Sequence, residues 1–179
     1  MPPNKITIIA ADDHPIVVNG IKLSLIDATE FEFVAEAFSE ASLYSVLQEQ
    51  TADLLILDLN FKGDNSLQYL DRIYQLRPHI KVIIFSSYNA PSLIKSAMSH
   101  RIHGYLLKDT PRAKLIDALH RIHAGERYLP PRMEGENNPF DSDHGLVDDF
   151  LKKNNLSHRE LEVIQLIVDG VFADVELAG

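Results

Sequence analysis

The sequence predicts an α/β fold: a five-stranded parallel sheet, doubly wound, with helices on both faces. Short runs of β-branched and aliphatic residues recur five times in the first two-thirds of the chain, as is typical of buried strands. Amphipathic stretches separate these runs, and such alternation favours parallel strands joined by right-handed crossovers. The expected strands are Ile6–Ala10, Phe33–Ala37, Leu54–Leu57, Val82–Phe85 and Tyr105–Leu107.

Apolar residues three or four positions apart mark the expected helices, because that spacing places them on one helical face. A helix is predicted between or after the strands wherever such a stripe occurs. The five stripes are Ile16, Val17, Ile21 and Leu25; Leu43, Val46 and Leu47; Leu67, Leu70, Ile73 and Leu76; Ile94, Ala97 and Met98; and Leu115, Ile116, Leu119 and Ile122.

The composition is that of a soluble globular protein, with 45% hydrophobic and 24% charged residues in 179. No apolar run approaches the roughly 18 residues of a membrane span, and the first residues do not resemble a signal peptide. The absence of cysteine excludes disulfides and thiolate sites. We therefore expect a cytoplasmic protein that does not enter a membrane.

The last third differs from the rest. Residues 1–124 carry the strand–helix pattern, whereas residues 125–155 are rich in Pro, Gly, Asn and Asp and are predicted to be a linker. A new helix is expected from Ser157, with Glu160 completing a capping box, so residues 156–179 predict an incomplete all-α fragment. The net charge of −9 divides into −2 for residues 1–130 and −7 for the remainder, which argues against DNA binding by this chain.

Polar residues follow four of the five expected strands. Asp12 and Asp13 follow the first, Asp58 the third, Ser86 the fourth and Lys108 the fifth. In an open parallel sheet the carboxyl ends of the strands meet at one edge, where ligands bind. We therefore expect three carboxylates, a hydroxyl and an ammonium group to lie together.

This combination predicts phosphoryl chemistry. Carboxylates that converge repel one another unless a cation lies between them, and hard oxygen ligands with no His or Cys favour Mg²⁺. Lys108 is suited to a phosphate oxygen and Ser86 offers a hydroxyl donor. Asp58, alone at the end of the expected central strand, is the predicted nucleophile.

Each residue taken alone also fits a structural role. Asp13 could cap the first helix, Asp58 could be a solvated loop acid, and Lys108 could be a surface lysine. Ser86 could belong to a turn. The functional interpretation depends on the four positions jointly, since short motifs often match by chance.

Residues 5–124 resemble the receiver domains of two-component response regulators. The motifs that carry the resemblance are IIAADDHP, LLILDLN, VIIFSS and GYLLKD, and the first and last are similar to the NarL/FixJ subfamily. The resemblance implies a CheY-like, flavodoxin-like fold. It also implies that Asp13 and Asp58 bind Mg²⁺ directly, Asp12 through water, and Asn60 through its backbone carbonyl.

By the same resemblance, Asp58 would accept a phosphoryl group from a sensor histidine kinase or a phosphotransfer protein. Ser86 and Lys108 would contact that group, and Tyr105 occupies the position of the aromatic switch residue, although it could also be a core aromatic. Phosphorylation would favour a homodimer. The family implies no enzymatic turnover beyond self-phosphorylation and self-dephosphorylation.

One departure from the family lies after Asp58, where the chain reads DLNFKGDNSL and places Lys62 at a position where proline is common. The change frees the backbone φ angle and restores an N–H donor. We expect it to alter the loop and leave the phosphorylation chemistry intact.

A second resemblance is partial: LSHRELEVIQLIVDG is similar to the first helix of a LuxR-type helix-turn-helix domain. The recognition helix does not follow, and base edges cannot be read without it. We therefore expect DNA binding only in the full-length protein. The alternative is a stand-alone receiver that acts through protein–protein interaction.

Two other classes fit less well. A flavodoxin-like cofactor binder would need a phosphate loop after the first strand, where this chain has the acidic ADDHP. A haloacid-dehalogenase-type phosphatase would need a second acid at position 60, which is Asn60.

Overall fold

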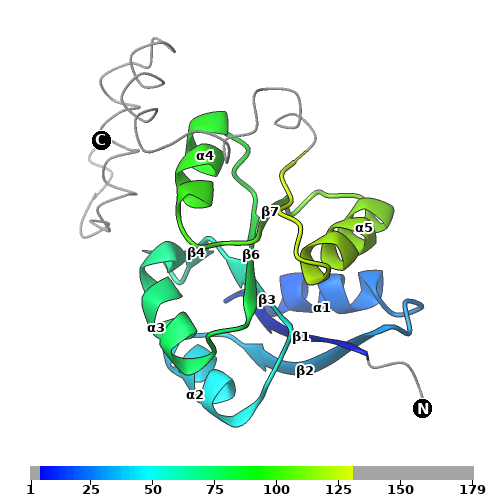
Figure 1. Cartoon of the computed structure of the whole chain (residues 1–179), viewed down its shortest axis with the longest axis horizontal. Helices are drawn as coiled ribbons and strands as arrows, with labels where there is room; N and C mark the ends of the chain where they lie inside the picture. Colours follow the sequence, from blue (N-terminus) through cyan, green and yellow to red (C-terminus); the bar gives the residue numbers. More distant parts are fainter. Residues whose placement is uncertain (1–4, 131–179) are drawn as a thin grey trace.

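Five parallel strands in the order β2-β1-β3-β6-β7 form the centre of the computed structural model, which describes residues 5–130 (Figure 1). The order makes β3 the central strand, with β1 and β6 on either side of it. All five residues of β3 are buried, as a strand covered on both faces requires. The strands are β1 (Ile6–Ala11), β2 (Phe31–Ala37), β3 (Leu54–Asp58), β6 (Lys81–Ser86) and β7 (Gly104–Leu107).

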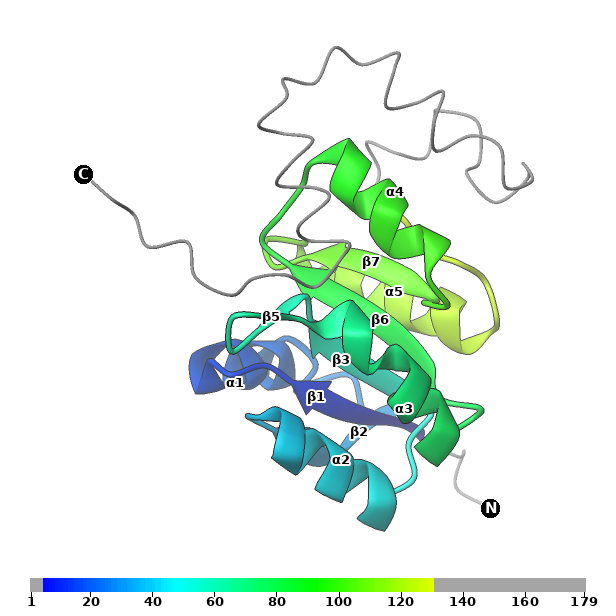
Figure 2. The same cartoon turned by 90° about the vertical axis from the view of Figure 1, so that its left-hand side faces the viewer.

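Helices cover both faces of this sheet (Figures 1 and 2). On one face, α1 (Pro15–Ser24) and α5 (Arg112–His123) bury their apolar stripes against the strands. On the other face lie α2 (Glu40–Glu49), α3 (Leu70–Leu76) and α4 (Pro91–Ser99). Side chains of successive strand residues point to opposite faces, so each buried strand supplies both cores. The predicted doubly wound α/β sheet is confirmed.

The segment after β3 differs from the prediction. The chain first forms a hairpin of β4 (Asn60–Phe61) and β5 (Asp64–Asn65), which lies before the apolar stripe of Leu67, Leu70, Ile73 and Leu76 and was not predicted. A 3₁₀ turn, Ser66–Tyr69, then precedes α3. The hairpin turns on two residues with positive φ, Lys62 at 56° and Gly63 at 89°, as a type I′ turn requires. Proline, fixed near −65°, could not occupy position 62 in this turn.

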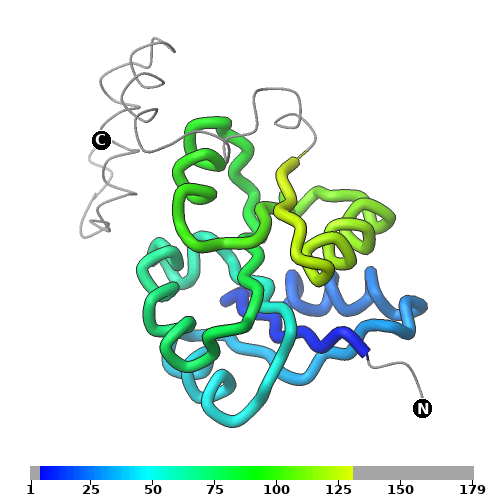
Figure 3. The backbone as a smooth tube through the Cα atoms, in the orientation of Figure 1, coloured from blue at the N-terminus to red at the C-terminus, as the bar shows by residue number. Residues whose placement is uncertain are grey.

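The packed region extends beyond the boundary expected at residue 124. Gly125, with φ of 101°, ends α5, and the chain then turns back along the edge strand β7 (Figure 3). The N–H of Tyr105 donates to the carbonyl of Tyr128 at 2.9 Å, and the N–H of Tyr128 donates to His103 at 3.1 Å. Residues 125–128, predicted as linker, therefore protect one edge of the sheet.

Gly104 permits this close packing. A Cβ atom at Gly104 would lie 2.5 Å from Cδ1 of Ile122 and 3.5 Å from Cβ of Tyr128. The rest of the predicted linker and the predicted helix-turn-helix fragment (residues 156–179) lie outside the described residues. Within residues 5–130, no helix is both long enough and apolar enough to cross a membrane.

Candidate functional site

The carboxyl edge of the sheet brings the predicted site residues together. Asp12 follows β1, Asp58 is the last residue of β3, Ser86 is the last residue of β6, and Lys108 follows β7. The strand order places β1, β3 and β6 side by side, so the ends of non-consecutive strands become neighbours. Asp12 and Asp58 are almost fully buried, at 2% and 5% exposed.

Lys108 joins two of these carboxylates. Its Nζ lies 2.7 Å from Oδ2 of Asp12 and 3.1 Å from Oδ1 of Asp58. Burial lowers the pKa of Lys108, but the hydrogen bonds and charges of the two aspartates outweigh it, and the net pKa is raised. Lys108 is therefore a fixed cation beside Asp58.

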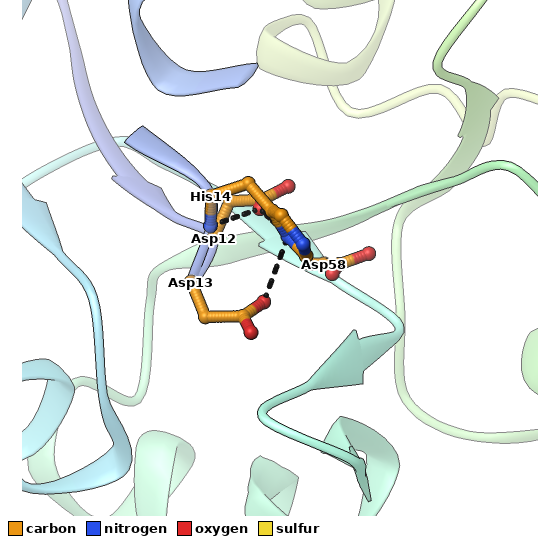
Figure 4. A group of neighbouring side chains, drawn as sticks. All are labelled: Asp12, Asp13, His14 and Asp58. Atoms are coloured by element: carbon orange, nitrogen blue, oxygen red, sulfur yellow. Dashed lines mark hydrogen bonds and ion pairs between the residues drawn. The ribbon is translucent and has the colours of Figure 1, made fainter. Parts of the chain in front are cut away.

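Three carboxylates converge here, as Figure 4 shows. One possible ligand atom from each of Asp12, Asp13, His14 and Asp58 lies within 4.8 Å of all the others. Two oxygens of this cluster are buried: Oδ2 of Asp12 lies 2.7 Å from Nζ of Lys108, and Oδ1 of Asp13 lies 3.2 Å from Nδ1 of His14. Carboxylate oxygens that converge in this way suit a hard divalent cation, so the cluster could bind a metal.

His14 is part of the cluster, although no role was predicted for it from the sequence. Its Nδ1 lies 3.2 Å from Oδ1 of Asp12 and 3.2 Å from Oδ1 of Asp13, while its side chain is largely exposed. Its position directly after the acidic pair was the available signal. Asp13 does not cap α1, because the N-cap is His14 and no side chain bonds to the first turn.

The pKa of Asp58 is raised to about 6. Burial is the largest cause, and the charge of Asp12 adds to it. Lys108 and the backbone N–H of Asn60 act in the opposite direction by stabilising the carboxylate. Asn60 itself is exposed at the start of β4, so its contribution to the site comes from the backbone. The negative charge of Asp58 is therefore only partly compensated by Lys108 and the backbone.

Ser86 and Tyr105 both form hydrogen bonds to the backbone of Tyr88, beside the cluster. Oγ of Ser86 accepts a hydrogen bond from the backbone N–H of Tyr88 at 3.1 Å. The hydroxyl of Tyr105 donates to the backbone carbonyl of Tyr88 at 2.9 Å. Tyr105 is fully buried, and burial raises its pKa to about 12, so it remains a neutral donor. The loop after β6 is thus hydrogen-bonded both to Oγ of Ser86 and to the hydroxyl of the buried Tyr105.

An acidic cluster and a lysine at the carboxyl edge of a 2-1-3-6-7 parallel sheet define the class of receiver-like α/β proteins. A family model for the response regulator receiver domain matches residues 8–120. The chain belongs to this family, and its relatives place it among LuxR-family response regulators of two-component signalling.

The similarity extends to curated and solved proteins. The chain is 28% identical to the transcriptional regulatory protein DegU of Brevibacillus brevis, over 93% of this chain and 76% of DegU. It is 33% identical to the nitrate/nitrite response regulator NarL of Escherichia coli K12, over 69% of this chain and 57% of NarL. The isolated REC domain of RcsB from Salmonella enterica, solved with BeF₃⁻, matches with a TM-score of 0.67 and 28% identity over 73% of this chain and 97% of that domain.

Proposed function

We propose that this chain accepts a phosphoryl group on Asp58 from a phosphohistidine of a sensor kinase or phosphotransfer protein, and that phosphorylation controls its dimerisation. The observation that carries the proposal is the buried Asp58 carboxylate, 3.1 Å from Lys108 Nζ and grouped with Asp12 and Asp13. The chain acts as the acceptor in one transfer per cycle, not as an enzyme that turns over a separate substrate.

In the transfer step an oxygen of Asp58 attacks phosphorus, the bond from phosphorus to the donor imidazole breaks, and the imidazole nitrogen keeps the electron pair. Such transfers depend mainly on position and charge neutralisation. Lys108 lies where it can neutralise a phosphoryl oxygen, and Ser86 can donate its hydroxyl to another.

Magnesium is the proposed metal, with Asp13 and Asp58 as direct ligands, Asp12 through water and Asn60 through its carbonyl. The fit is supported by the convergence of buried carboxylate oxygens and by a proposed donor set made of oxygens. When bound, the ion would neutralise both the carboxylates and the phosphoryl oxygens. Lys108 would then be released from Asp12 to contact the phosphoryl group.

Phosphorylation would be transmitted through Ser86 and Tyr105. A phosphoryl group on Asp58 would draw the hydroxyl of Ser86 and break its bond to Tyr88, which is also bonded to Tyr105. We propose that the resulting change favours a homodimer. In solved structures similar to this chain, RcsB dimers are bound to DNA, and we propose DNA control by the full-length protein that carries a complete DNA-binding domain.

A protein donor would find apolar surface beside the site. Three large side chains of α1 and the turn after it are exposed: Ile16 by 78%, Leu23 by 65% and Ile26 by 69%. They lie at helical spacing, and α1 begins directly after His14. An apolar strip next to a phosphoacceptor suits docking of an amphipathic helix that presents a phosphohistidine.

The test is labelling of the 179-residue chain by acetyl phosphate with and without Mg²⁺. We expect one acid-labile phosphate in the wild type, none in Asp58→Ala, and weak labelling in Asp12→Ala through loss of metal. Asp109→Ala, which removes an exposed aspartate next to Lys108, is the control and should label as the wild type does. Full labelling of Asp58→Ala would show that another residue is the acceptor.

A further inference from the structure

A group of basic side chains lies at the amino edge of the sheet, opposite the phosphorylation site. Lys81 begins β6, while Arg101 and His103 directly precede β7. Arg127 precedes Tyr128, which runs parallel to β7. We call Lys81, Arg101, His103 and Arg127 the basic edge patch.

The side chain of His103 lies within electrostatic range of the other three members of the basic edge patch. The pKa of His103 is lowered, first by burial and then by the charges of Lys81, Arg127 and Arg101. Its Nδ1 accepts the N–H of Val82 at 3.2 Å, which fixes a neutral ring and leaves Nε2 as a donor. The guanidinium of Arg101 lies over the ring of Tyr74, with its Cζ 4.4 Å from the ring centroid.

Within residues 5–130, acidic side chains do not compensate the charges of Lys81 and Arg101 at short range. In the part of the chain that the structure describes, neither Lys81 nor Arg101 has a carboxylate within ion-pair distance. The charges of Asp53 and Lys81 interact beyond ion-pair distance. The carboxylate of Asp53 already accepts two hydrogen bonds from Thr7. A concentration of cations of this kind attracts an anionic partner.

We propose that the basic edge patch binds the chain's own acidic segment, residues 134–149. This segment contains six Asp and Glu residues and no Lys or Arg. It begins four residues after Pro130, and four extended residues span about 13–14 Å, enough to return to Arg127. A short tether holds the segment at an effective concentration of about millimolar, so that even weak attraction fills the site.

The contact would hold the acidic segment beside the receiver and mask the basic edge patch from other polyanions. It involves no residue of the phosphorylation site and does not depend on the proposed phosphoryl transfer. Because it is electrostatic and close to solvent, it should weaken as salt shortens the screening length to about 4–5 Å near 0.5 M.

The test uses a nitroxide on Ser142→Cys in the full chain, which has no other cysteine. We expect selective loss of amide signals at positions 81, 101–103 and 127, reversed in about 0.5 M NaCl. Replacing the six acids by Asn and Gln should also restore these signals, and this change leaves residues 5–130 untouched. Arg101→Glu with Arg127→Glu should do the same, whereas the matched control Lys62→Glu with Lys114→Glu should not.

Three outcomes would overturn the proposal. The first is a uniform or absent loss of signal, or a loss that persists after the six acids are neutralised. The second is signal loss in an isotope-labelled chain mixed with a separate spin-labelled chain, which would make a second copy the occupant. The third is perturbation of the patch only when duplex DNA is added, which would make nucleic acid the occupant.

Discussion

At the scale of single residues, Asp58 combines two properties that conflict in the absence of a cation. Its position at the end of the buried central strand suits it as an acceptor, but burial and Asp12 raise its pKa to about 6. The ordinary value is 3.8, so between about pH 4 and pH 6 the folded chain keeps a proton that the unfolded chain has lost. Stability therefore falls as the pH rises through this window.

Asp58→Asn should consequently stabilise the metal-free chain. At pH 7.5 we expect a gain of about 1–3 kcal/mol in the free energy of unfolding, since each pKa unit corresponds to about 1.4 kcal/mol. The gain should disappear below about pH 3, where the aspartate is protonated in both the folded and the unfolded chain. Urea unfolding in EDTA at several pH values measures it, with the exposed Asp109→Asn as control. A gain that does not change with pH would contradict the raised pKa.

Sequence patterns predicted the site positions but not their contacts. The places of Asp12, Asp58, Ser86 and Lys108 follow from strand ends in a parallel sheet, which a sequence reveals through its apolar runs. The ion pair from Lys108 to Asp12 is different, because it depends on side-chain rotamers and on β1 lying next to β3. The position of His14 was missed for the same reason.

Among the elements, the segment between β3 and α3 departs most from the sequence prediction, because the hairpin was not predicted and the first turn of the predicted helix is 3₁₀. Apolar spacing from Leu67 to Leu76 predicted one helix, but spacing alone does not separate a 3₁₀ turn from an α-helix. The hairpin depends on the φ angles of Lys62 and Gly63, and only the glycine could be recognised in the sequence.

Because of this turn, we expect proline at position 62 to lower the stability of the chain. Restoring the residue common in the family, Lys62→Pro, should destabilise this chain by more than about 1 kcal/mol, because φ of 56° is closed to proline. Lys62→Gly, the matched control, should be neutral or stabilise by up to about 1 kcal/mol, since glycine adopts positive φ without strain. Thermal unfolding compares the two, and a stabilising proline would contradict the type I′ turn.

The packing of α5 on β7 can be tested by a double-mutant cycle. Gly104→Ala places a methyl group 2.5 Å from Cδ1 of Ile122 and should destabilise by about 1–3 kcal/mol. Ile122→Val removes that atom and alone should destabilise by about 0.5–1.5 kcal/mol. The double variant should be less destabilised than the sum of the two, because the clash is gone. Strict additivity in urea unfolding would show that the two residues are not in contact.

In the molecule as a whole, phosphorylation at one edge of the sheet is proposed to control self-association. Lys108 is the cation that would sense the new charge, since it lies next to Asp58 and is already held by carboxylates. The loop tied to Ser86 and Tyr105 is the structural route by which the surface could change.

Lys108→Ala should therefore separate the two events. We expect phosphorylation by acetyl phosphate to remain detectable, because Asp58 is still present, while dimer formation with Mg²⁺ and beryllofluoride is lost. Sedimentation velocity provides the measurement, and Lys114→Ala, an exposed lysine of α5, is the control that should dimerise as the wild type does. Normal dimers of Lys108→Ala would remove this lysine from the switch.

The most direct test of the central claim is to map the phosphorylated residue. Borohydride reduces an aspartyl phosphate to homoserine, which marks the acceptor permanently for peptide mass spectrometry. After treatment of the 179-residue chain with acetyl phosphate and Mg²⁺, the account predicts homoserine at position 58, and none when Mg²⁺ is withheld. Homoserine at position 12 or 13, or an unmodified Asp58 in a chain that carries phosphate, would contradict it.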